Sequence, residues 1–393
     1  MAETTQFNMQ PLLPAEGSAA TAELTDLAFD LTAKAAALAG AVPDAVAAGT
    51  LVRAMNCYYS NLIEGHNTHP RDIERVLASD FSNDPDQRDL QLEAAAHIAV
   101  QELVDAGTED VPFGPTEQYV RWLHRAFCER LPESLLWVVD PDTGERYHVG
   151  PGELRTRHVV VGQHVPPDAD AVSPLLGHFA ETYDPDRLGR AKRVIAVAAS
   201  HHRLVWVHPF LDGNGRVARM LSHAYLRHIG LGSALWSVSR GLARTRYREV
   251  LAGADRPRQG DLDGRGALSE AGLVAFCRYF LETCIDQVNY MSEILDPARL
   301  LARMERQVGI AVAEGMLPKR SFSLLREALM IGTFHRGQAP TITGYQERKA
   351  RQILSELLDR GYLVSDGPRA PVRLGFPVEV LADWFPRLYP QDD

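Results

Sequence analysis

HPFLDGNGRVAR, residues 208–219 of this 393-residue chain, brings together a histidine, an aspartate, two glycines around an asparagine, and two arginines three residues apart. Apolar residues recur at helical spacing before it, in 190–207, and after it, in 215–230. The stretch is therefore predicted to form a loop between two helices, with the second helix starting at Asn214. A helix N-terminus exposes unpaired N–H groups and the positive end of the helix dipole, so this loop predicts an anion site.

The residues around the start of the second helix suit the binding of phosphate groups. Gly213 and Gly215 let the backbone approach phosphate oxygens closely and permit positive φ angles. Asn214 adds a side-chain donor. Arg216 and Arg219, three residues apart, share a helix face from which both can reach the outer phosphates of a nucleotide. Together these residues predict a nucleotide-phosphate site.

Two further residues of the stretch add chemistry to that site. Asp212 offers a hard oxygen, which suits a Mg²⁺ ion held jointly with phosphates. His208 lies beside the cradle, where it can take a proton from an incoming hydroxyl group. The stretch thus combines a base, a metal ligand and a phosphate site.

This string resembles the signature of the Fic family, His-Pro-Phe-x-(Asp/Glu)-Gly-Asn-Gly-Arg-x-x-Arg, and matches it at every defined position. The resemblance extends from about residue 50 to residue 285. GELRTRHVVVGQHVPPDADAV, residues 152–172, is similar to the hairpin that the family uses as a flap. SEAGLVAFCRYFLETC, residues 269–284, is similar to its late core helix.

The resemblance implies a protein adenylyltransferase, which transfers AMP from ATP to a Ser, Thr or Tyr hydroxyl group of a target protein. It makes His208 the base and Asp212 the ligand of Mg²⁺, with Mn²⁺ as an alternative ion. It assigns the α- and β-phosphates to Gly213, Asn214 and Gly215, the β-phosphate region to Arg216 and the γ-phosphate to Arg219. The phosphorylating Doc branch departs from this glycine pattern, so glycines at 213 and 215 favour AMP transfer. UMP or phosphocholine transfer uses the same motif and stays open.

The resemblance also implies a target-binding flap and a residue of the nucleotide pocket. An extended target segment would pair with the flap by strand addition. Tyr247 lines the nucleotide pocket by family analogy, while packing in the core is the competing interpretation. The target protein is not identified, and self-modification is expected. The flap residues are Val159, Val160, Val161 and Gly162.

YYSNLIEGHNT, residues 58–68, contains a serine and a glutamate one helical turn apart. By itself the stretch indicates only a helix that ends at Gly65, with Ser60 and Glu64 on one face. Beside the complete motif it resembles the family's inhibitory helix, (Ser/Thr)-x-x-x-Glu-(Gly/Asn), here at about residues 51–65. The resemblance implies that Glu64 pairs with Arg219 and keeps ATP unproductive. A hydrolase that removes AMP from a target is the alternative activity.

The last 75 residues differ from the rest of the chain in charge. The whole chain carries a net charge of −10, whereas residues 319–393 carry 11 Lys+Arg against 9 Asp+Glu. Three helical segments followed by two strand segments predict a winged helix-turn-helix. Its recognition helix is predicted over 343–360, with Arg348, Lys349 and Arg351 on the early turns. DNA binding, protein docking and homodimer formation all stay open, and a DNA-binding regulator with a nucleotide-sensing core is a rival function.

The composition and the segment pattern predict a mainly α-helical fold. The expected regions are an N-terminal helical region at 1–110, a Fic-type core with a short β-hairpin flap at 111–310, and the winged helix at 319–393. Residues 1–20 are expected to be a mobile lead-in. Four scattered cysteines, the absence of a secretion pattern at the start and the absence of a membrane-spanning run indicate a cytoplasmic protein.

Overall fold

The computed structural model describes residues 8–42, 45–66, 68–77, 80–140 and 143–389. Two compact units make up the chain. Unit 1 comprises Met1–Ala35 and Asn56–Gln287, and unit 2 comprises Ala36–Met55 and Val288–Asp393. These two units do not coincide with the three regions expected from the sequence. The bounds of those three regions stay predictions.

Three helices have residues in both units: α2 (Ala19–Ala41), α3 (Ala45–Glu64) and α12 (Glu270–Ile294). The remaining α-helices of unit 1 are α4 (Pro70–Leu77), α5 (Pro85–Ala106), α6 (Glu117–Cys128), α7 (Val172–Tyr183), α8 (Arg190–Val207), α9 (Asn214–His228), α10 (Val238–Ala243) and α11 (Tyr247–Ala254). Its short 3₁₀ turns are η1 (Glu133–Leu135), η2 (Ala169–Ala171), η3 (Pro185–Arg187) and η4 (Ser233–Leu235). Of these helices, α4, α10 and α11 were not predicted from the sequence.

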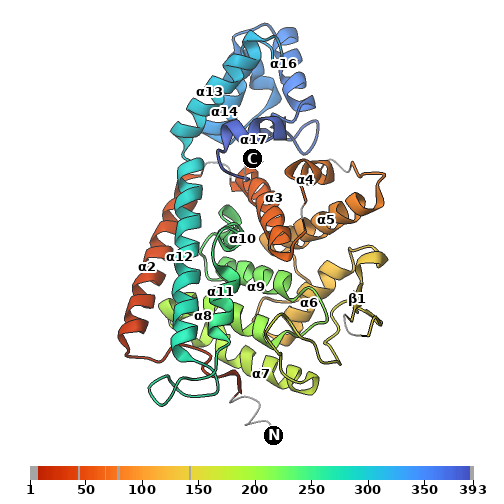
Figure 1. Ribbon diagram of the computed structural model, residues 1–393. Helices are drawn as coiled ribbons and strands as arrows, with labels where there is room; N and C mark the ends of the chain where they lie inside the picture. Colours follow the sequence, from red (N-terminus) through yellow and green to blue (C-terminus); the bar gives the residue numbers. More distant parts are fainter. Residues whose placement is uncertain (1–7, 43–44, 67, 78–79, 141–142, 390–393) are drawn as a thin grey trace. The chain divides into compact units, whose positions relative to one another are not determined.

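The core of unit 1 is built around α8 and α9. All residues from Val194 to Leu204 on α8 are buried, and so are all residues from Arg216 to Leu226 on α9. A helix that is buried all round must be covered by other elements. Here α8 packs on α9 and α7, while α5 and α6 also pack on α9 (Figure 1). The loop of residues 208–213 therefore joins the two central helices of the unit.

Local sequence explains where several of these helices begin and end. The carboxylate of Asp84 accepts a 3.0 Å hydrogen bond from the Gln87 N–H group, and Pro85 occupies the first position of α5. Gly107 closes the same helix with a φ of 67°, a conformation that favours glycine. The hydroxyl group of Thr116 caps α6 in the same way by accepting from Tyr119.

The small β-structure of unit 1 lies partly elsewhere than expected. Strands β1 (Trp137–Val139) and β2 (Arg146–His148) form an antiparallel pair that was not predicted. The expected flap hairpin is reduced to a single bridge, in which Val161 and His164 exchange two backbone hydrogen bonds of 3.0 Å. Gly162, with a φ of 61°, is the first central residue of this two-residue turn, where such hairpins favour glycine.

The N-terminal lead-in is not mobile over its described part, so that expectation was wrong for residues 8–20. Met9 and Leu12 are buried. The Pro11 carbonyl accepts hydrogen bonds of 3.0 and 2.8 Å from the buried Arg203 guanidinium, and the Leu12 carbonyl accepts one of 2.6 Å from the Tyr183 hydroxyl. A buried guanidinium needs such partners, and the lead-in supplies them. Residues 1–7 lie outside the described part.

The elements of unit 2 follow α12 in the order helix, helix, strand, helix, helix, strand, strand, helix. They are α13 (Pro297–Ala313), α14 (Ser321–Ile331), β3 (Thr333–Phe334), η5 (Arg336–Gln338), α15 (Ala339–Thr343), α16 (Glu347–Asp359), β4 (Leu363–Val364), β5 (Val372–Leu374) and α17 (Val378–Trp384). The strands form an antiparallel sheet in the order β3-β5-β4. Helices α13 and α17 were not predicted.

The predicted helix over 343–360 is interrupted near its start. α15 ends at Thr343, Gly344 takes a left-handed φ of 71°, and α16 begins only at Glu347. Because a left-handed residue cannot continue an α-helix, Arg348, Lys349 and Arg351 fall in the first two turns of α16.

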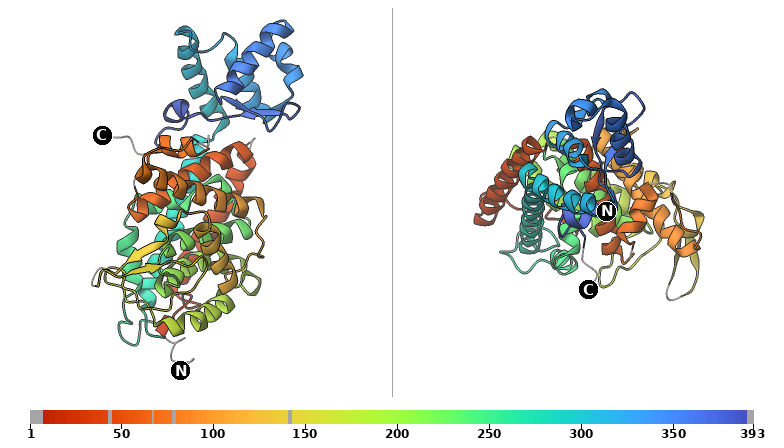
Figure 2. Two further views of the ribbon diagram at one scale, coloured as in Figure 1. Left: turned by 90° about the vertical axis from the view of Figure 1, so that its right-hand side faces the viewer. Right: turned by 90° about the horizontal axis from the view of Figure 1, so that it is seen from above.

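The elements of each unit can be followed from two further sides in Figure 2. The expectation of a mainly helical fold is confirmed. Within the described part of the chain, no helix combines the length and the apolar composition needed to cross a bilayer.

Candidate active site

His208 stands at the end of α8 in a left-handed conformation, with φ 50° and ψ 63°. Its N–H group donates to the Leu204 carbonyl at 3.1 Å. The buried Arg155 side chain holds this corner, because its Nε donates to the His208 carbonyl at 2.7 Å. The Arg155 N–H group also donates to the Pro209 carbonyl at 2.9 Å. Arg155 therefore fixes the turn from which the candidate base projects.

The loop between α8 and α9 is held by its own asparagine. The Asn214 side chain accepts from the Phe210 N–H group and donates to the Phe210 carbonyl, both at 2.9 Å. Gly213 precedes the helix with a φ of 78°. The Asn214 amide is thus engaged with Phe210, while its backbone N–H group lies at the start of α9, where an anion would bind.

His124 on α6 supports the same loop from below. Its ring stacks on Phe210 with centroids 3.9 Å apart and an interplanar angle of 5°. Nδ1 accepts from the Gly152 N–H group at 2.9 Å, so in the neutral ring Nε2 carries the hydrogen and donates to the Asp212 carbonyl at 3.2 Å. Burial lowers the pKa of His124 to about 4, which keeps this arrangement neutral at pH 7.

His208 is half-buried and lines a cavity of about 940 Å³. Burial lowers its pKa to about 4, and the nearby His164 and Arg155 act in the same direction. Its Nδ1 is buried and has no hydrogen-bond partner among the described residues. At pH 7 the ring is therefore neutral and able to accept a proton.

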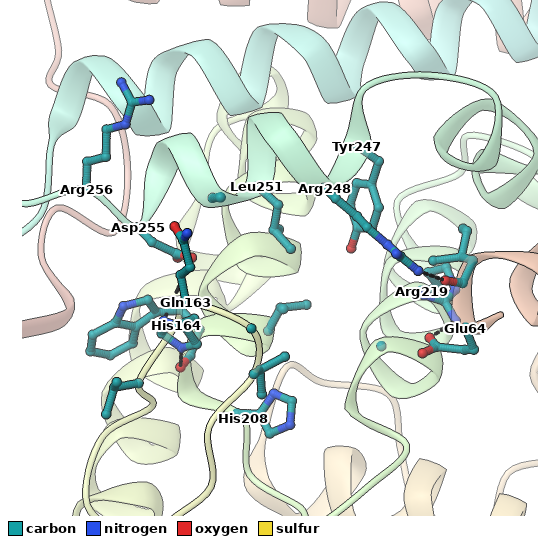
Figure 3. Close-up of a pocket in the computed structure, with 18 of the residues that line it drawn as sticks. Glu64, Gln163, His164, His208, Arg219, Tyr247, Arg248, Leu251, Asp255 and Arg256 are labelled. Atoms are coloured by element: carbon teal, nitrogen blue, oxygen red, sulfur yellow. Dashed lines mark hydrogen bonds and ion pairs between the residues drawn. The ribbon is translucent and has the colours of Figure 1, made fainter.

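Glu64 at the end of α3 lies beside Arg219 of α9, as Figure 3 shows. Its Oε1 lies 2.5 Å from Nη2 of Arg219. Ser60, one turn earlier on α3, accepts from Arg219 through its hydroxyl group at 3.0 Å and through its carbonyl at 3.2 Å. Burial acts to raise the pKa of Glu64, but the guanidiniums of Arg219 and Arg216 hold that pKa below its ordinary value. The carboxylate is thus ionised in this pair.

Gly215 makes the approach of Glu64 sterically feasible. A Cβ atom at this position would lie 2.4 Å from Oε1 of Glu64 and 3.1 Å from Nη1 of Arg219. The glycine that was predicted to admit a phosphate therefore admits a carboxylate in this structure. Gly65, with a φ of 91°, ends the helix that carries this carboxylate.

Arg216 does not share the surroundings of Arg219, in contrast to the expectation that both arginines face one ligand. Its guanidinium pairs with Glu93 of α5 and lies 5.2 Å from the Phe127 ring centroid. Glu93 is 2% exposed and its Oε2 lies 2.6 Å from Nδ1 of His66. The hydrogen bond to Glu93 raises the pKa of His66. Arg216 is not among the residues that line the cavity.

Asp212 is exposed on the loop, next to Gly213. Among the described residues, no group of three or more His, Cys, Asp or Glu side chains is arranged to hold a metal ion. A single carboxylate of this kind suits an ion that takes its other ligands from phosphates and water, as Mg²⁺ commonly does.

Tyr247 satisfies both interpretations of the sequence, because it is buried and also lines the cavity. The Ser222 hydroxyl donates to the Ala218 carbonyl, so it accepts from His201 Nδ1 at 2.8 Å. His201 Nε2 then accepts from the Tyr247 hydroxyl at 2.8 Å. The hydroxyl group is engaged with His201, which leaves the ring itself to face the cavity.

The flap residues border the same cavity. Val161 and Gly162 line it, together with Gln163 and His164. The side chains of Val160 and Val161 are 69% and 43% exposed. Apolar side chains at an exposed turn match the surface expected for pairing with an extended segment.

Comparison with known proteins places residues 115–226 within the model of the Fic/DOC family. The chain carries a Fic/DOC family domain. The domain spans α6 to α9 and includes His208 and Arg219, whereas Glu64 and Tyr247 lie outside the matched residues.

Curated relatives support this assignment over part of their length. The chain is 36% identical over 114 residues to the protein adenylyltransferase Fic of Drosophila erecta, covering 28% of this chain and 23% of that protein. It is 30% identical over 173 residues to the protein adenylyltransferase Fic of Aedes aegypti, covering 44% and 32%. The chain thus spans about a quarter to a third of the length of these relatives.

A solved structure extends the likeness beyond the Fic domain. A Fic family protein from Desulfovibrio desulfuricans G20 matches with a TM-score of 0.53 and 16% identity, covering 92% of this chain and 98% of that one. At this identity the likeness concerns the fold.

Several residues that shape the site of the Fic domain were not predicted. His124, Arg155 and Glu93 contact the motif from other helices or loops, and Arg248 of α11 donates to the Ile63 carbonyl at 2.6 Å. Only Glu93 had a local signal, since it is an acid within the alanine-rich stretch LEAAAHIAV of a helix.

Proposed function

We propose that this chain is a protein adenylyltransferase, which transfers AMP from ATP to a Ser, Thr or Tyr hydroxyl group of a protein. The observation that carries the proposal is a neutral, half-buried His208 that lines one cavity with Arg219 and Gly215, near the start of α9. The relatives named protein adenylyltransferase Fic support the choice of reaction.

The proposed reaction needs a base and an anion site close together. The hydroxyl oxygen of the target attacks the α-phosphorus, and the bond from that phosphorus to the oxygen bridging to the β-phosphate breaks. The hydroxyl proton passes to His208, and pyrophosphate leaves. The first N–H groups of α9 would bind the phosphates, and Arg219 would bind the γ-phosphate.

The residues present also suit a Mg²⁺ ion, or Mn²⁺ in its place. Asp212 would hold the ion from the exposed loop. When bound, the ion would neutralise phosphate charge and orient the leaving group. The nucleotide phosphates would complete its coordination, which fits a protein site with one carboxylate.

We further propose that Glu64 restrains this activity. Its carboxylate lies 2.5 Å from Arg219, beside Gly215 at the start of α9. An anion in that position competes with the γ-phosphate for the same guanidinium. Arg219 is 2% exposed, so it depends on an anionic partner.

Labelled nucleotides test both proposals. Wild type, Glu64→Gly and Glu64→Gly/His208→Ala proteins are incubated with Mg²⁺ and with α-labelled ATP, GTP, CTP or UTP, and modified residues are found by mass spectrometry. We expect strong AMP labelling with Glu64→Gly, weak labelling with wild type and none with the double variant. A Glu64→Gly protein that labels neither itself nor any protein of a lysate would contradict the transfer activity. Equal labelling by wild type and Glu64→Gly would contradict the restraint.

Hydrolytic removal of AMP from a target is an alternative for the same cavity. The observation that favours it is that Glu64 and His208 both line the cavity, so the glutamate could act on a water molecule there. A target labelled by the Glu64→Gly protein supplies the substrate. Release of AMP by wild type, with loss of release in Glu64→Gln, would support this alternative.

DNA binding by unit 2 is a second candidate function. The helices α14, α15 and α16 with the β3-β5-β4 sheet support the expected winged helix, and Arg348, Lys349 and Gln352 are exposed on α16. Retention of random-sequence duplex DNA by the full chain would be measured at several salt concentrations. We expect Arg348→Glu/Lys349→Glu to lose retention and Arg306→Glu, on α13, to keep it. Equal retention by the two variants would contradict a role for α16.

A further inference from the structure

Three segments of unit 1 meet at the side chain of His164. They are the flap turn 161–164, the end of α8 and the end of α11, and all three contribute to the lining of the cavity (Figure 3). His164 Nε2 donates to the Trp206 carbonyl at 2.8 Å. Its Nδ1 lies 3.8 Å from Oδ2 of Asp255, and the side chain is 14% exposed. His164 is therefore the inward-facing residue of an otherwise exposed turn.

The acceptor of this hydrogen bond is a helix-terminal carbonyl. The last four carbonyl groups of an α-helix have no partner within the helix. At the end of α8, the Leu204 carbonyl accepts from His208, the Val207 carbonyl accepts from Arg155 at 3.4 Å, and the Trp206 carbonyl accepts from His164. Two of these three donors come from the segment that carries the flap, so this segment caps α8 from outside.

Asp255 lies on the other side of the His164 ring. Oδ1 of Asp255 lies 3.1 Å from Nε2 of His202. Nδ1 of His202 accepts from the buried Arg203 at 2.7 Å, so Nε2 carries the hydrogen of the neutral ring. The carboxylate that faces His164 is thus anchored to the central helix α8.

The flap turn has little else to hold it. Val161 and His164 form its single backbone bridge, and the side chains of Val160 and Val165 are each 69% exposed. A turn with so few buried contacts opens at low free-energy cost. Arg155 holds the two ends of the flap, because its guanidinium donates to the carbonyls of Arg157 and Pro167. The position of the turn itself relative to His208 therefore depends on His164, which ties it to Trp206, two residues before His208.

We infer that His164 is a positioning residue, which fixes the flap against the end of α8 and so sets the distance between a target segment on the flap and the base His208. The inference rests on the proposed function. His164 would affect the rate through the orientation of the acceptor hydroxyl group, because it holds the flap surface on which the target segment binds. A misplaced acceptor costs on the order of 100-fold in rate.

A matched pair of amide substitutions separates the donor at Nε2 from the rest of the side chain. The amide nitrogen of His164→Gln lies at about the reach of Nε2, so it can still donate to the Trp206 carbonyl. The amide nitrogen of His164→Asn corresponds to the Nδ1 position, so it cannot reach that carbonyl. Both variants are neutral and polar, and both are made in the Glu64→Gly protein.

Two measurements are made on these proteins. The first is AMP labelling as a function of ATP concentration, and the second is trypsin cleavage after Arg157, an exposed residue at the start of the flap. We expect His164→Asn to lower the maximal labelling rate by roughly 10- to 100-fold, with the half-saturating ATP concentration unchanged, and to speed the cleavage. His164→Gln should retain most of the labelling rate and the slow cleavage.

The outcomes also separate this inference from the proposed function. Equal behaviour of the Gln and Asn variants in both measurements would overturn the role of the Nε2 donor, whether both keep or both lose the rate. If the Glu64→Gly protein itself fails to label, the proposed function fails. The cleavage measurement then still decides whether His164 holds the flap.

Discussion

Glu64 of α3 and Arg219 of α9, separated by 155 residues in the chain, form an ion pair with 2.5 Å between Oε1 and Nη2. The pair lies at the start of α9, where the helix dipole favours an anion. Arg219 also donates to both acceptors of Ser60. Removal of the carboxylate therefore leaves a buried guanidinium with Ser60 as its nearest remaining partner, and the first two predictions follow from this.

Glu64→Gln should lower the free energy of unfolding of unit 1 while raising AMP labelling. The amide keeps the shape of the side chain but loses the charge opposite Arg219. Loss of one partner of a buried pair costs about 3–5 kcal/mol. Since the Glu64 side chain is 31% exposed, we expect roughly 1–2 kcal/mol. Urea denaturation followed by circular dichroism measures the change, and an unchanged midpoint would show that the pair adds nothing to stability.

Gly215→Ala should uncouple Glu64 from Arg219 with little loss of stability. The new Cβ atom would lie 2.4 Å from Oε1 of Glu64, which is the end of a flexible side chain and can move away. Alanine is also the better helix residue by roughly 0.5–1 kcal/mol. A double-mutant cycle with Glu64→Gln checks this. The effect of Glu64→Gln on unfolding should shrink toward zero in the Gly215→Ala protein, and purely additive effects would contradict the predicted clash.

Glu93→Gln should destabilise the chain more than Glu64→Gln. Glu93 is 2% exposed and contacts both Arg216 and His66, so its loss leaves the buried Arg216 guanidinium without its acidic partner. We expect about 3–5 kcal/mol from the buried pair. Glu181→Gln, at an exposed position of α7, is the control and should change the unfolding free energy by less than about 0.5 kcal/mol. Similar values for the two variants would argue against a buried pair.

The free energy of unfolding of unit 1 should begin to fall near pH 6.5, which is above the pH range in which carboxylates titrate. Burial lowers the pKa values of His97 and His201 to about 3 and that of His124 to about 4. In the unfolded chain these groups titrate near pH 6.5, so below that pH the unfolded state binds more protons. The free energy of unfolding then falls as the pH falls, by up to about 1.4 kcal/mol per pH unit for each histidine.

The pH dependence has its own control. His97→Gln removes one of these groups, so the unfolding free energy should fall less steeply between pH 6.5 and pH 4.5, by about one proton. Urea denaturation at each half pH unit gives the slope for wild type and variant. Identical slopes would mean that His97 is not held neutral in the folded chain.

The local part of the site followed from the sequence, because its signals lie within a few residues of one another. The α9 start at Asn214, the left-handed Gly213 and the shared face of Ser60 and Glu64 all depend on helix geometry and glycine chemistry. The helical spacing of apolar residues in 190–207 likewise predicted α8. The pairing of Glu64 with Arg219 came from the resemblance to the family, since spacing alone indicated only a capped helix.

Only the tertiary structure decided which partners the remaining groups meet. Their three-residue spacing predicted the same surroundings for Arg216 and Arg219. In the structure Arg216 pairs with Glu93 and does not line the cavity, whereas Arg219 pairs with Glu64 and lines it. His164 carried no signal as a flap anchor, because its acceptor is a helix-terminal carbonyl 42 residues away. Secondary structure follows from neighbouring residues, whereas buried charges and terminal carbonyl groups take whichever partner the packing of distant helices supplies.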